Sequence, residues 1–575
     1  MDRPPAAPMS AAGMDASPWL DAFFKLQFER LPVNATFTGI HDHDGQLPDW
    51  SDRAVRQWST EIDQLLARAP SGAGEPEAVR HDLLLAANHL QLQRHEFDLP
   101  QFHTGNPAHW TGEAVFSIIG LFLRDAEPGT ERARSALSRM RLIPEFLAQS
   151  RAAIREAPAE WTARASRESR AAAAYFDTGL PLLLRQRDLE IPGILDAAIS
   201  TRDAFLDHAR WLDEELAARP RHDVAAGRDA FDRYLRLGHC LPAGHDAHWL
   251  ERHAARALTA AQERLAALAE ELFPGSEWRE QLERLPDHHR SVDDYDQAYP
   301  AVWEAARAAA TAAKLVTWPD YPIEYVPIPE SDREAAADLY YLFYRCPPPF
   351  GRPETHRYLV TPIDRTMPAG EQERRLRQVN DSQIKLNHVV HHGGLGHHVQ
   401  NWHAFRAPSR VGQVAGVDCA NRIGMFCAGT LVEGWACYAT QLMEEIGFLT
   451  PLERLGEAHG AVRMAARAVA DVGIHTGAMS LAEAAAMYER EAAMPAGAAM
   501  GEAVKNSMFP GAAVIYLLGV EGIRELRESM TGRDGAGSDV RAFHDRFLGY
   551  GAIPVALIAE SMRAGETSDE RPAAQ

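Results

Sequence analysis

Residues 251–273 read ERHAARALTAAQERLAALAEELF and show the pattern that decides the fold. Leu265, Leu268 and Leu272 recur at intervals of three and four residues, which places them on one face of an α-helix. Strong helix formers, chiefly Ala, Glu and Arg, fill most of the remaining positions. The same pattern recurs in SALSRMRLIPEFLAQSRAAI at 135–154. We therefore predict a mainly α-helical protein built from many amphipathic helices.

Working outward from this stretch, changes in composition divide the chain into five segments. Residues 1–16 are rich in Pro and Ala and predict a flexible lead-in. Residues 17–316 predict a helical N-terminal lobe. Prolines, aromatics and β-branched residues in short alternating runs predict a small sheet or extended loops over 317–369. Helical patterns resume over 370–564, and the polar residues 565–575 predict a disordered tail.

Composition and charge exclude several classes of protein. The 59 Lys and Arg against 80 Asp and Glu give a net charge of −21, which repels phosphate backbones and anionic membranes. No apolar stretch approaches the roughly 20 residues that span a bilayer. We therefore expect neither nucleic acid nor a membrane as a partner, and the sequence leaves the oligomeric state open.

The cysteine pattern and the N-terminus bear on location. The five cysteines are irregularly spaced and form no CxxC pair, which is typical of a reducing compartment. Asp15 interrupts the N-terminal run where a signal peptide needs an apolar core. Together these features predict a cytoplasmic protein.

Six of the 25 histidines lie within HVVHHGGLGHHVQNWH at 388–403. Imidazole is a good ligand for zinc, and catalytic zinc sites combine histidines from one helix with a carboxylate from another and an open position for water. Glu433, within VEGWACYAT at 432–440, is a candidate for that carboxylate. The cluster therefore predicts a metal site with zinc as the favoured ion and iron or manganese as alternatives.

Spacing alone leaves the chelating pair open. In a continuous helix His388 and His392 lie one turn apart, whereas His391 and His398 are separated by roughly 10 Å of rise. Glycines at 393, 394 and 396 weaken a regular helix and permit a turn that folds the later histidines toward the earlier ones. Cys437 lies four residues after Glu433, where it is either a thiolate ligand or nucleophile or, as is commoner, a small buried core residue.

Four stretches carry a resemblance to a known family. They are HHGGLGHHVQ at 391–400, EGWACYAT at 433–440, DVGIH at 471–475 and EAVKNSMFPGAAVIYLLG at 502–519. In these stretches the chain resembles the bacterial domain of unknown function 885 family, whose members look like zinc metallopeptidases with a large multi-helix fold. The specific resemblance covers roughly the last two hundred residues.

The resemblance implies roles for individual residues. By this likeness His391 and either His397 or His398 look like the histidine ligands of zinc, and Glu433 looks like the carboxylate ligand. It also implies that His475, oriented by Asp471, faces the substrate or stabilises the transition state. Tyr516 is implied to lie near the same cleft.

The main departure from the family pattern is His392, which stands where the family has the glutamate that deprotonates the metal-bound water. Leu395, Ala512 and the pair Lys505-Asn506 also depart from it. Three interpretations of His392 follow: it is the base itself, it joins the metal with or without His388, or it marks an inactive site retained for binding.

The leading hypothesis is a metal-dependent hydrolase in which His392 is the base. Its substrate would be a peptide or a small amide-like or carbonyl-containing compound, attacked by a metal-activated water. The alternatives are a lyase-type metalloenzyme with a histidine-rich site and a catalytically inactive binding protein.

Overall fold

The predicted mainly α-helical fold with a small β segment is confirmed. The computed structural model describes residues 18–123, 127–319, 321–339, 348–350, 356–415, 427–531 and 539–569. Strands β1 (Ile323–Pro327) and β2 (His356–Val360) pair in parallel, from Ile323 opposite His356 to Pro327 opposite Val360. Both strands lie within the predicted segment 317–369. The predicted lead-in 1–16 lies outside the described residues.

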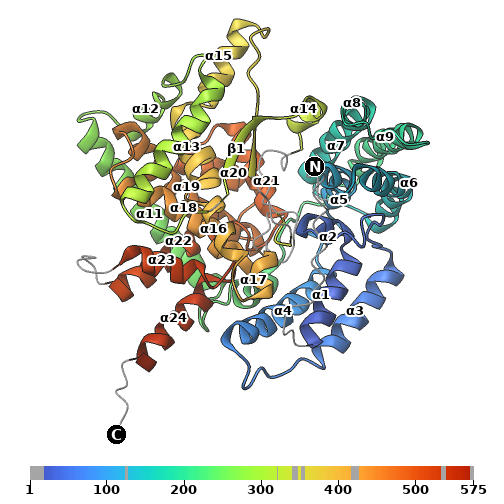
Figure 1. Cartoon of the computed structure of the whole chain (residues 1–575), viewed down its shortest axis with the longest axis horizontal. Helices are drawn as coiled ribbons and strands as arrows, with labels where there is room; N and C mark the ends of the chain where they lie inside the picture. The colour runs from blue at the N-terminus through green and yellow to red at the C-terminus, as the bar shows by residue number, and fades with distance from the viewer. Residues whose placement is uncertain are drawn as a thin grey trace, which may run out of the picture.

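Helices α1 to α9 gather on one side of the molecule in Figure 1. They are α1 (Pro18–Arg30), α2 (Pro32–Thr38), α3 (Asp52–Leu66), α4 (Glu77–Glu96), α5 (Pro107–Phe122), α6 (Gly129–Ala153), α7 (Ala159–Ala174), α8 (Leu180–Gln186) and α9 (Ile194–Trp211). The π-helical turns η1 (Tyr175–Gly179) and η2 (Leu212–Leu216) follow α7 and α9.

The next helices lead across the molecule to the small sheet. They are α10 (Arg228–Arg233), the π-helix η3 (Tyr234–Gly238), α11 (Ala247–Leu272), α12 (Trp278–Leu282), the 3-10 turn η4 (Leu285–Asp287), α13 (Tyr295–Ala312), the 3-10 turn η5 (Glu330–Asp332) and α14 (Arg333–Ala336). In Figure 1, α11, α12 and α13 lie on the opposite side from α1 to α9, together with C-terminal helices.

The C-terminal helices begin after β2. They are α15 (Ala369–Gln378), the π-helix η6 (Gln383–Gly393), α16 (His397–Ala404), α17 (Arg410–Ala415), α18 (Gly429–Glu445), α19 (Pro451–His475), α20 (Leu481–Ala492), α21 (Ala496–Ser507), α22 (Ile515–Thr531), α23 (Val540–Leu548) and α24 (Val555–Asp569). Helix α24 extends past the predicted start of the tail at 565, and residues 570–575 lie outside the described ranges.

The predicted lobe boundary at 316 does not separate two cores. Helix α11 packs along α19, and its Leu258, Leu265 and Leu268 share a buried cluster with Leu455 and Val462 of α19. The two helices have 26 and 25 residues, so each is roughly 38 Å long and offers the other an apolar face of equal length. The stretch that sets the helical pattern therefore finds its partner far along the chain.

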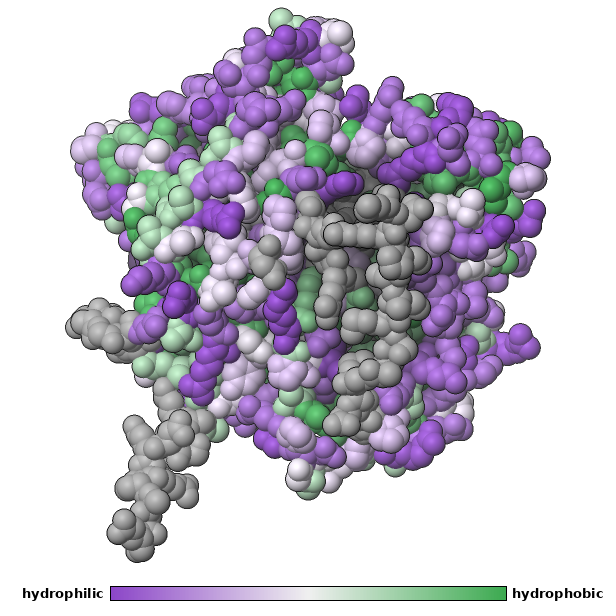
Figure 2. Space-filling model, in the orientation of Figure 1, coloured by the Kyte–Doolittle hydropathy of each residue, from purple (hydrophilic) through white to green (hydrophobic). Residues whose placement is uncertain are grey.

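The content of charged residues is reflected in the surface of the protein (Figure 2). On the face shown in Figure 2, hydrophilic residues predominate and hydrophobic residues are scattered among them. No helix in the described ranges combines the length and the apolar composition needed to cross a membrane.

Helices α18 and α22 touch through their backbones, and this contact positions Glu433. A Cβ atom added to Gly434 would lie 2.5 Å from Gly519 Cα, and one added to Gly519 would lie 2.1 Å from the Thr430 carbonyl oxygen. Such distances leave no room for any side chain at either glycine. Glu433 precedes Gly434 on α18. The close packing fixes the position and rotation of α18, and with them the point from which the Glu433 side chain projects.

A buried carboxyl group between α11, α18 and α19 gives the fold a dependence on pH. Glu457 is 4% exposed, and the Arg264 guanidinium lies 3.9 Å from its carboxylate while pairing more closely with Glu444 at 3.1 Å. Burial and the nearby Glu444 raise the pKa of Glu457 to about 8. The folded state therefore retains a proton that the unfolded state releases between about pH 4.5 and 8, and stability falls as pH rises through that window.

We expect Glu457→Gln to remove this loss. The neutral amide has nearly the same shape, so the variant should gain about 2 kcal/mol over the wild type at pH 9 and little at pH 5. Urea denaturation of both proteins at the two pH values measures the difference. An equal difference at pH 5 and pH 9 would contradict the assignment of the raised pKa to Glu457.

Candidate metal centre

The histidine cluster stands on a π-helix followed by a glycine turn. His388, His391 and His392 belong to η6, and His397 begins α16 immediately after the turn. A Cβ atom at Gly396 would lie 1.9 Å from the His391 carbonyl oxygen, and one at Gly393 would lie 2.1 Å from the Tyr325 hydroxyl. Glycine is therefore required where the chain turns back, and the turn brings α16 beside the end of η6.

Three imidazoles and one carboxylate converge at this turn. Possible ligand atoms of His391, His392 and His397 all lie within 4.8 Å of one another. One carboxylate oxygen of Glu433, contributed by α18, lies 3.4 Å from His391 Nε2 and 3.8 Å from His397 Nε2. The sequence thus predicted residues that the fold does bring together.

Contacts behind the cluster orient two of the rings. His392 Nδ1 lies 2.7 Å from the Asn387 carbonyl oxygen, to which it donates a hydrogen bond. The proton on Nδ1 leaves Nε2 as the nitrogen with the lone pair. His391 Nδ1 lies 3.9 Å from Cys437 Sγ, one turn after Glu433 on α18. The donation from His392 to a backbone carbonyl is typical of an imidazole whose other nitrogen is a metal ligand.

The electrostatics of the cluster keep Glu433 charged and His392 neutral. Burial opposes ionisation of Glu433, but the contact with His391 and the charges of His397 and His391 outweigh it and lower its pKa below the usual value. Burial and the neighbouring His391 and His397 lower the pKa of His392 well below 6.5. For His391, burial is outweighed by contacts with Cys437 and Glu433, which raise its pKa to about 10. Glu433 and His392 thus already have the forms that bind a metal, whereas His391 would release a proton when a metal binds.

The structure selects His397 over His398 as the second histidine of the cluster. His398 is fully buried on the other side of α16, where its Nδ1 lies 3.4 Å from His356 Nδ1 and its ring packs against Tyr321. Adjacent residues on a helix point in different directions, so only one of the pair can face Glu433. His398 is therefore not a ligand in this geometry.

His388 also turns away from the cluster. Its Nδ1 lies 2.7 Å from the Tyr358 hydroxyl, and its ring packs beside Tyr299. The spacing that makes His388 and His392 a candidate pair holds for a regular α-helix, whereas this segment is a π-helix with wider hydrogen-bonded turns. His388 instead contacts Tyr358, whose ring packs against His392.

The predicted substrate-facing role of His475 is not supported by its surroundings. His475 is 0% exposed; its Nε2 donates to the Asn506 carbonyl oxygen at 3.0 Å, and its ring stacks on Phe231. Asp471 lies 3.6 Å from His475 Nε2, which is too long for a hydrogen bond. The Asp471 carboxylate instead accepts hydrogen bonds from the backbone N–H groups of residues 511, 513 and 514. DVGIH therefore anchors the turn before α22.

Tyr516 lies at the start of α22 and is half-buried. The Arg467 guanidinium stands over its ring at 4.7 Å and forms two hydrogen bonds with Glu502. These contacts place Tyr516 in a cation–π arrangement between α19 and α22.

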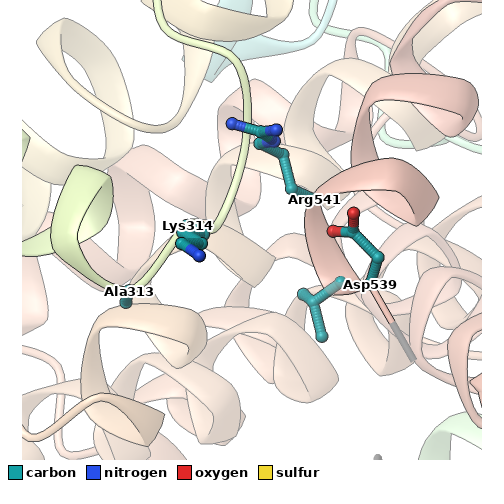
Figure 3. Close-up of a pocket in the computed structure, with 5 residues that line it drawn as sticks. Ala313, Lys314, Asp539 and Arg541 are labelled. Carbon is teal, nitrogen blue, oxygen red and sulfur yellow. The ribbon is translucent and has the colours of Figure 1, made fainter. Parts of the chain in front are cut away.

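A separate surface hollow lies away from the cluster. It has a volume of about 400 Å³ and lies between the end of α13 and the start of α23. Figure 3 shows Lys314, Asp539 and Arg541 around it, with Ala313 at its edge. None of the cluster residues lines this hollow, so it is not the candidate site.

Sequence reasoning missed the contacts that orient the ligands. The Asn387 carbonyl receives the His392 hydrogen bond because η6 is a π-helix, which the hydrophobic pattern does not distinguish from an α-helix. The sequence favours a core role for Cys437. Its position one turn after Glu433 nevertheless places its sulfur 3.9 Å from His391 Nδ1.

Comparison with known proteins extends over nearly the whole chain. The family described as "Bacterial protein of unknown function (DUF885)" matches residues 32–562. The solved structure of "a putative lipoprotein of unknown function" from Shewanella oneidensis has a TM-score of 0.75 at 21% identity, covering 95% of this chain and 99% of that one. "The putative lipoprotein from Colwellia psychrerythraea" has a TM-score of 0.65 at 14% identity, covering 96% and 99%.

These likenesses establish the fold and the family. At identities of 21% and 14% the two solved structures share the fold of this chain and carry no further argument about its chemistry. No curated protein matches the chain. The family match covers far more than half of the sequence. The chain therefore belongs to the family of bacterial proteins of unknown function designated DUF885.

Proposed function

We propose that this protein is a metal-dependent hydrolase of zinc-metallopeptidase-like character, with its metal held by His391, His397 and Glu433. One observation carries the proposal: the Nε2 atoms of two histidines from different helices converge on one oxygen of Glu433, at 3.4 and 3.8 Å. Two imidazoles and a carboxylate are a donor set of catalytic zinc sites. The donor set therefore fits a divalent metal.

The accessibility of these side chains supports catalysis over a purely structural site. The side chains of His391 and Glu433 are 15% and 19% exposed, so neither is sealed in the core as the ligands of a purely structural site often are. A bound metal would supply Lewis acidity and a nucleophilic water near neutral pH. Glu433 would hold the cation by charge, while the Asn387 carbonyl and Cys437 sulfur fix the rings of His392 and His391.

The substrate class follows from this chemistry. A peptide, a small amide or another carbonyl compound offers the polarisable oxygen on which such a centre acts. The negative net charge of −21 disfavours nucleic acid as the substrate. One observation favours the lyase-type alternative: the cluster has a third imidazole where the family pattern has the carboxylate base.

Reconstitution of the full chain tests the proposal. Protein freed of metal by chelation is loaded with zinc, iron(II) or manganese(II) and incubated with peptides, anilides, esters and small amides. We expect products that together contain the substrate plus one water, formed only by loaded protein and absent in Glu433→Gln. Elimination products would support the lyase-type reaction instead, and equal activity without metal would contradict both.

The predicted cytoplasmic location also stays a prediction. Both solved neighbours are described as a "putative lipoprotein", and that description weighs against a cytoplasmic location for this chain. Fractionation of cells that make the full natural protein decides between the two compartments.

Variants of Cys437 test the contact behind His391. Removing the sulfur with Cys437→Val should weaken metal binding by about 10-fold, because His391 Nδ1 loses the partner that orients the ring. Cys437→Ser keeps an acceptor of similar size and should stay within a few-fold of the wild type. Competition titration with a chromophoric chelator measures both affinities. Equal affinity of the valine variant and the wild type would show that the sulfur only fills space.

A further inference from the structure

We infer that His392 is a third imidazole ligand, so that the centre has three histidines and one carboxylate and favours a six-coordinate divalent metal, such as iron(II), manganese(II) or cobalt(II), over zinc. The inference rests on the metal centre proposed above and assigns its coordination. It departs from the family pattern implied by the sequence, in which this position carries the catalytic base.

Distances between the rings support the assignment. The ring centres of His391, His392 and His397 form a triangle with sides of 4.6, 4.9 and 5.4 Å. With metal–nitrogen bonds of about 2.1 Å, neighbouring imidazoles on one ion have ring centres roughly 4.5–5.2 Å apart. Of the two sides that include His392, the 4.6 Å side lies within this range and the 5.4 Å side slightly exceeds it, so a small movement of the rings brings His392 to the distance of a ligand.

A base would stand farther from the ligands. A histidine that takes a proton from a metal-bound water accepts a hydrogen bond of about 2.8 Å from that water. The water then lies between the metal and the histidine, so the histidine is farther from the metal than a ligand is. Its ring centre would then lie roughly 6 Å or more from those of the ligating histidines. The observed separations from His392 to His391 and His397 are shorter than this.

The hydrogen bond behind His392 is that of a ligand. Its Nδ1 donates to the Asn387 carbonyl at 2.7 Å, within the same π-helix, and this bond fixes the tautomer with Nε2 as the ligating atom. Tyr358 packs against the ring with centres 5.9 Å apart, and Tyr358 is itself held by His388. The ring is therefore fixed in orientation before any metal binds.

The number of donors determines which metal can remain reactive. Four protein ligands complete the tetrahedral shell that zinc prefers, and such zinc sites are closed and structural. A metal that accepts six ligands keeps two positions for water and substrate with the same four donors. Two further positions on a six-coordinate metal are compatible with the partial exposure of the His391 and Glu433 side chains, 15% and 19%.

Cobalt(II) loaded into the metal-free full chain tests the coordination, because its visible absorption is weak in six-coordinate sites and intense in four-coordinate ones. We expect weak absorption for the wild type, and manganese(II) should bind the wild type measurably. His392→Ala should lower cobalt affinity by at least about 10-fold and manganese affinity by more. His398→Ala, whose side chain faces His356 and Tyr321 away from the cluster, is the matched control and should keep the wild-type spectrum.

Two results would overturn the inference in different ways. If His392→Ala keeps the wild-type cobalt affinity and spectrum while His397→Ala loses cobalt, His392 is not a ligand and the proposed hydrolase centre stands without it. If the wild type binds neither cobalt nor manganese nor zinc, both this inference and the proposed function fail. Circular dichroism of each variant separates loss of a ligand from loss of the fold.

Discussion

His397→Ala is expected to abolish stoichiometric metal binding, whereas His398→Ala should retain it. His397 Nε2 lies 3.8 Å from the Glu433 carboxylate, while His398 faces His356 and Tyr321 on the far side of α16. Loss of a ligand should weaken binding by at least the 10- to 100-fold that loss of a supporting contact costs. Equilibrium dialysis with measurement of bound metal gives the stoichiometry of both variants.

The two alanine variants control for each other because they are neighbours on one buried turn. His398→Ala empties a fully buried position and should lower the melting temperature at least as much as His397→Ala does. A fold effect would therefore appear in both variants, but a ligand effect only in His397→Ala. Loss of metal by His398→Ala with full binding by His397→Ala would reverse the assignment made from the structure.

The second large effect is expected at the contact between α18 and α22. Gly519→Val places carbon atoms where the Thr430 carbonyl and Gly434 Cα already lie, at 2.1 and 2.6 Å from the new Cβ. Backbone atoms cannot rotate out of the way, so the helices must separate, and we expect a loss of about 3 kcal/mol or more. Because Glu433 lies on α18, metal affinity should fall with stability. Calorimetric melting of the full chain measures the first effect and metal titration the second.

Gly460→Ala provides the matched control for this prediction. Gly460 lies within α19, and no atom stands within 4 Å of a Cβ added there. Alanine in an open helical position should stabilise by up to about 1 kcal/mol. A melting temperature of Gly519→Val equal to that of the wild type would contradict the close packing of α18 and α22.

Local sequence pattern was sufficient for the fold class and for the location of the sheet. The spacing of the leucines in 251–273 predicts a helix without reference to the rest of the chain. The prolines and aromatics of 317–369 likewise indicate the segment that contains β1 and β2. The sequence pattern does not show which helices pack against each other. The partner of α11 is α19, far along the chain, and this long-range pairing joins the two predicted lobes into shared cores.

The candidate site could be predicted in composition but not in geometry. The histidine cluster and Glu433 lie together as expected, because clustered histidines and a carboxylate are the residue types that indicate a metal site. The choice of His397 over His398 depends on the turn at Gly393–Gly396 and on the π-helix before it, which hydrophobic periodicity does not report. The burial of His475 depends on its contacts with Phe231 and the Asn506 carbonyl, which belong to other parts of the chain.

A crystal structure of metal-loaded protein, with anomalous data on both sides of the absorption edge of the metal, tests the central claim most directly. We predict one anomalous peak per chain, bounded by His391, His392, His397 and Glu433. No peak among these four residues, or a single peak elsewhere in the molecule, would contradict the account.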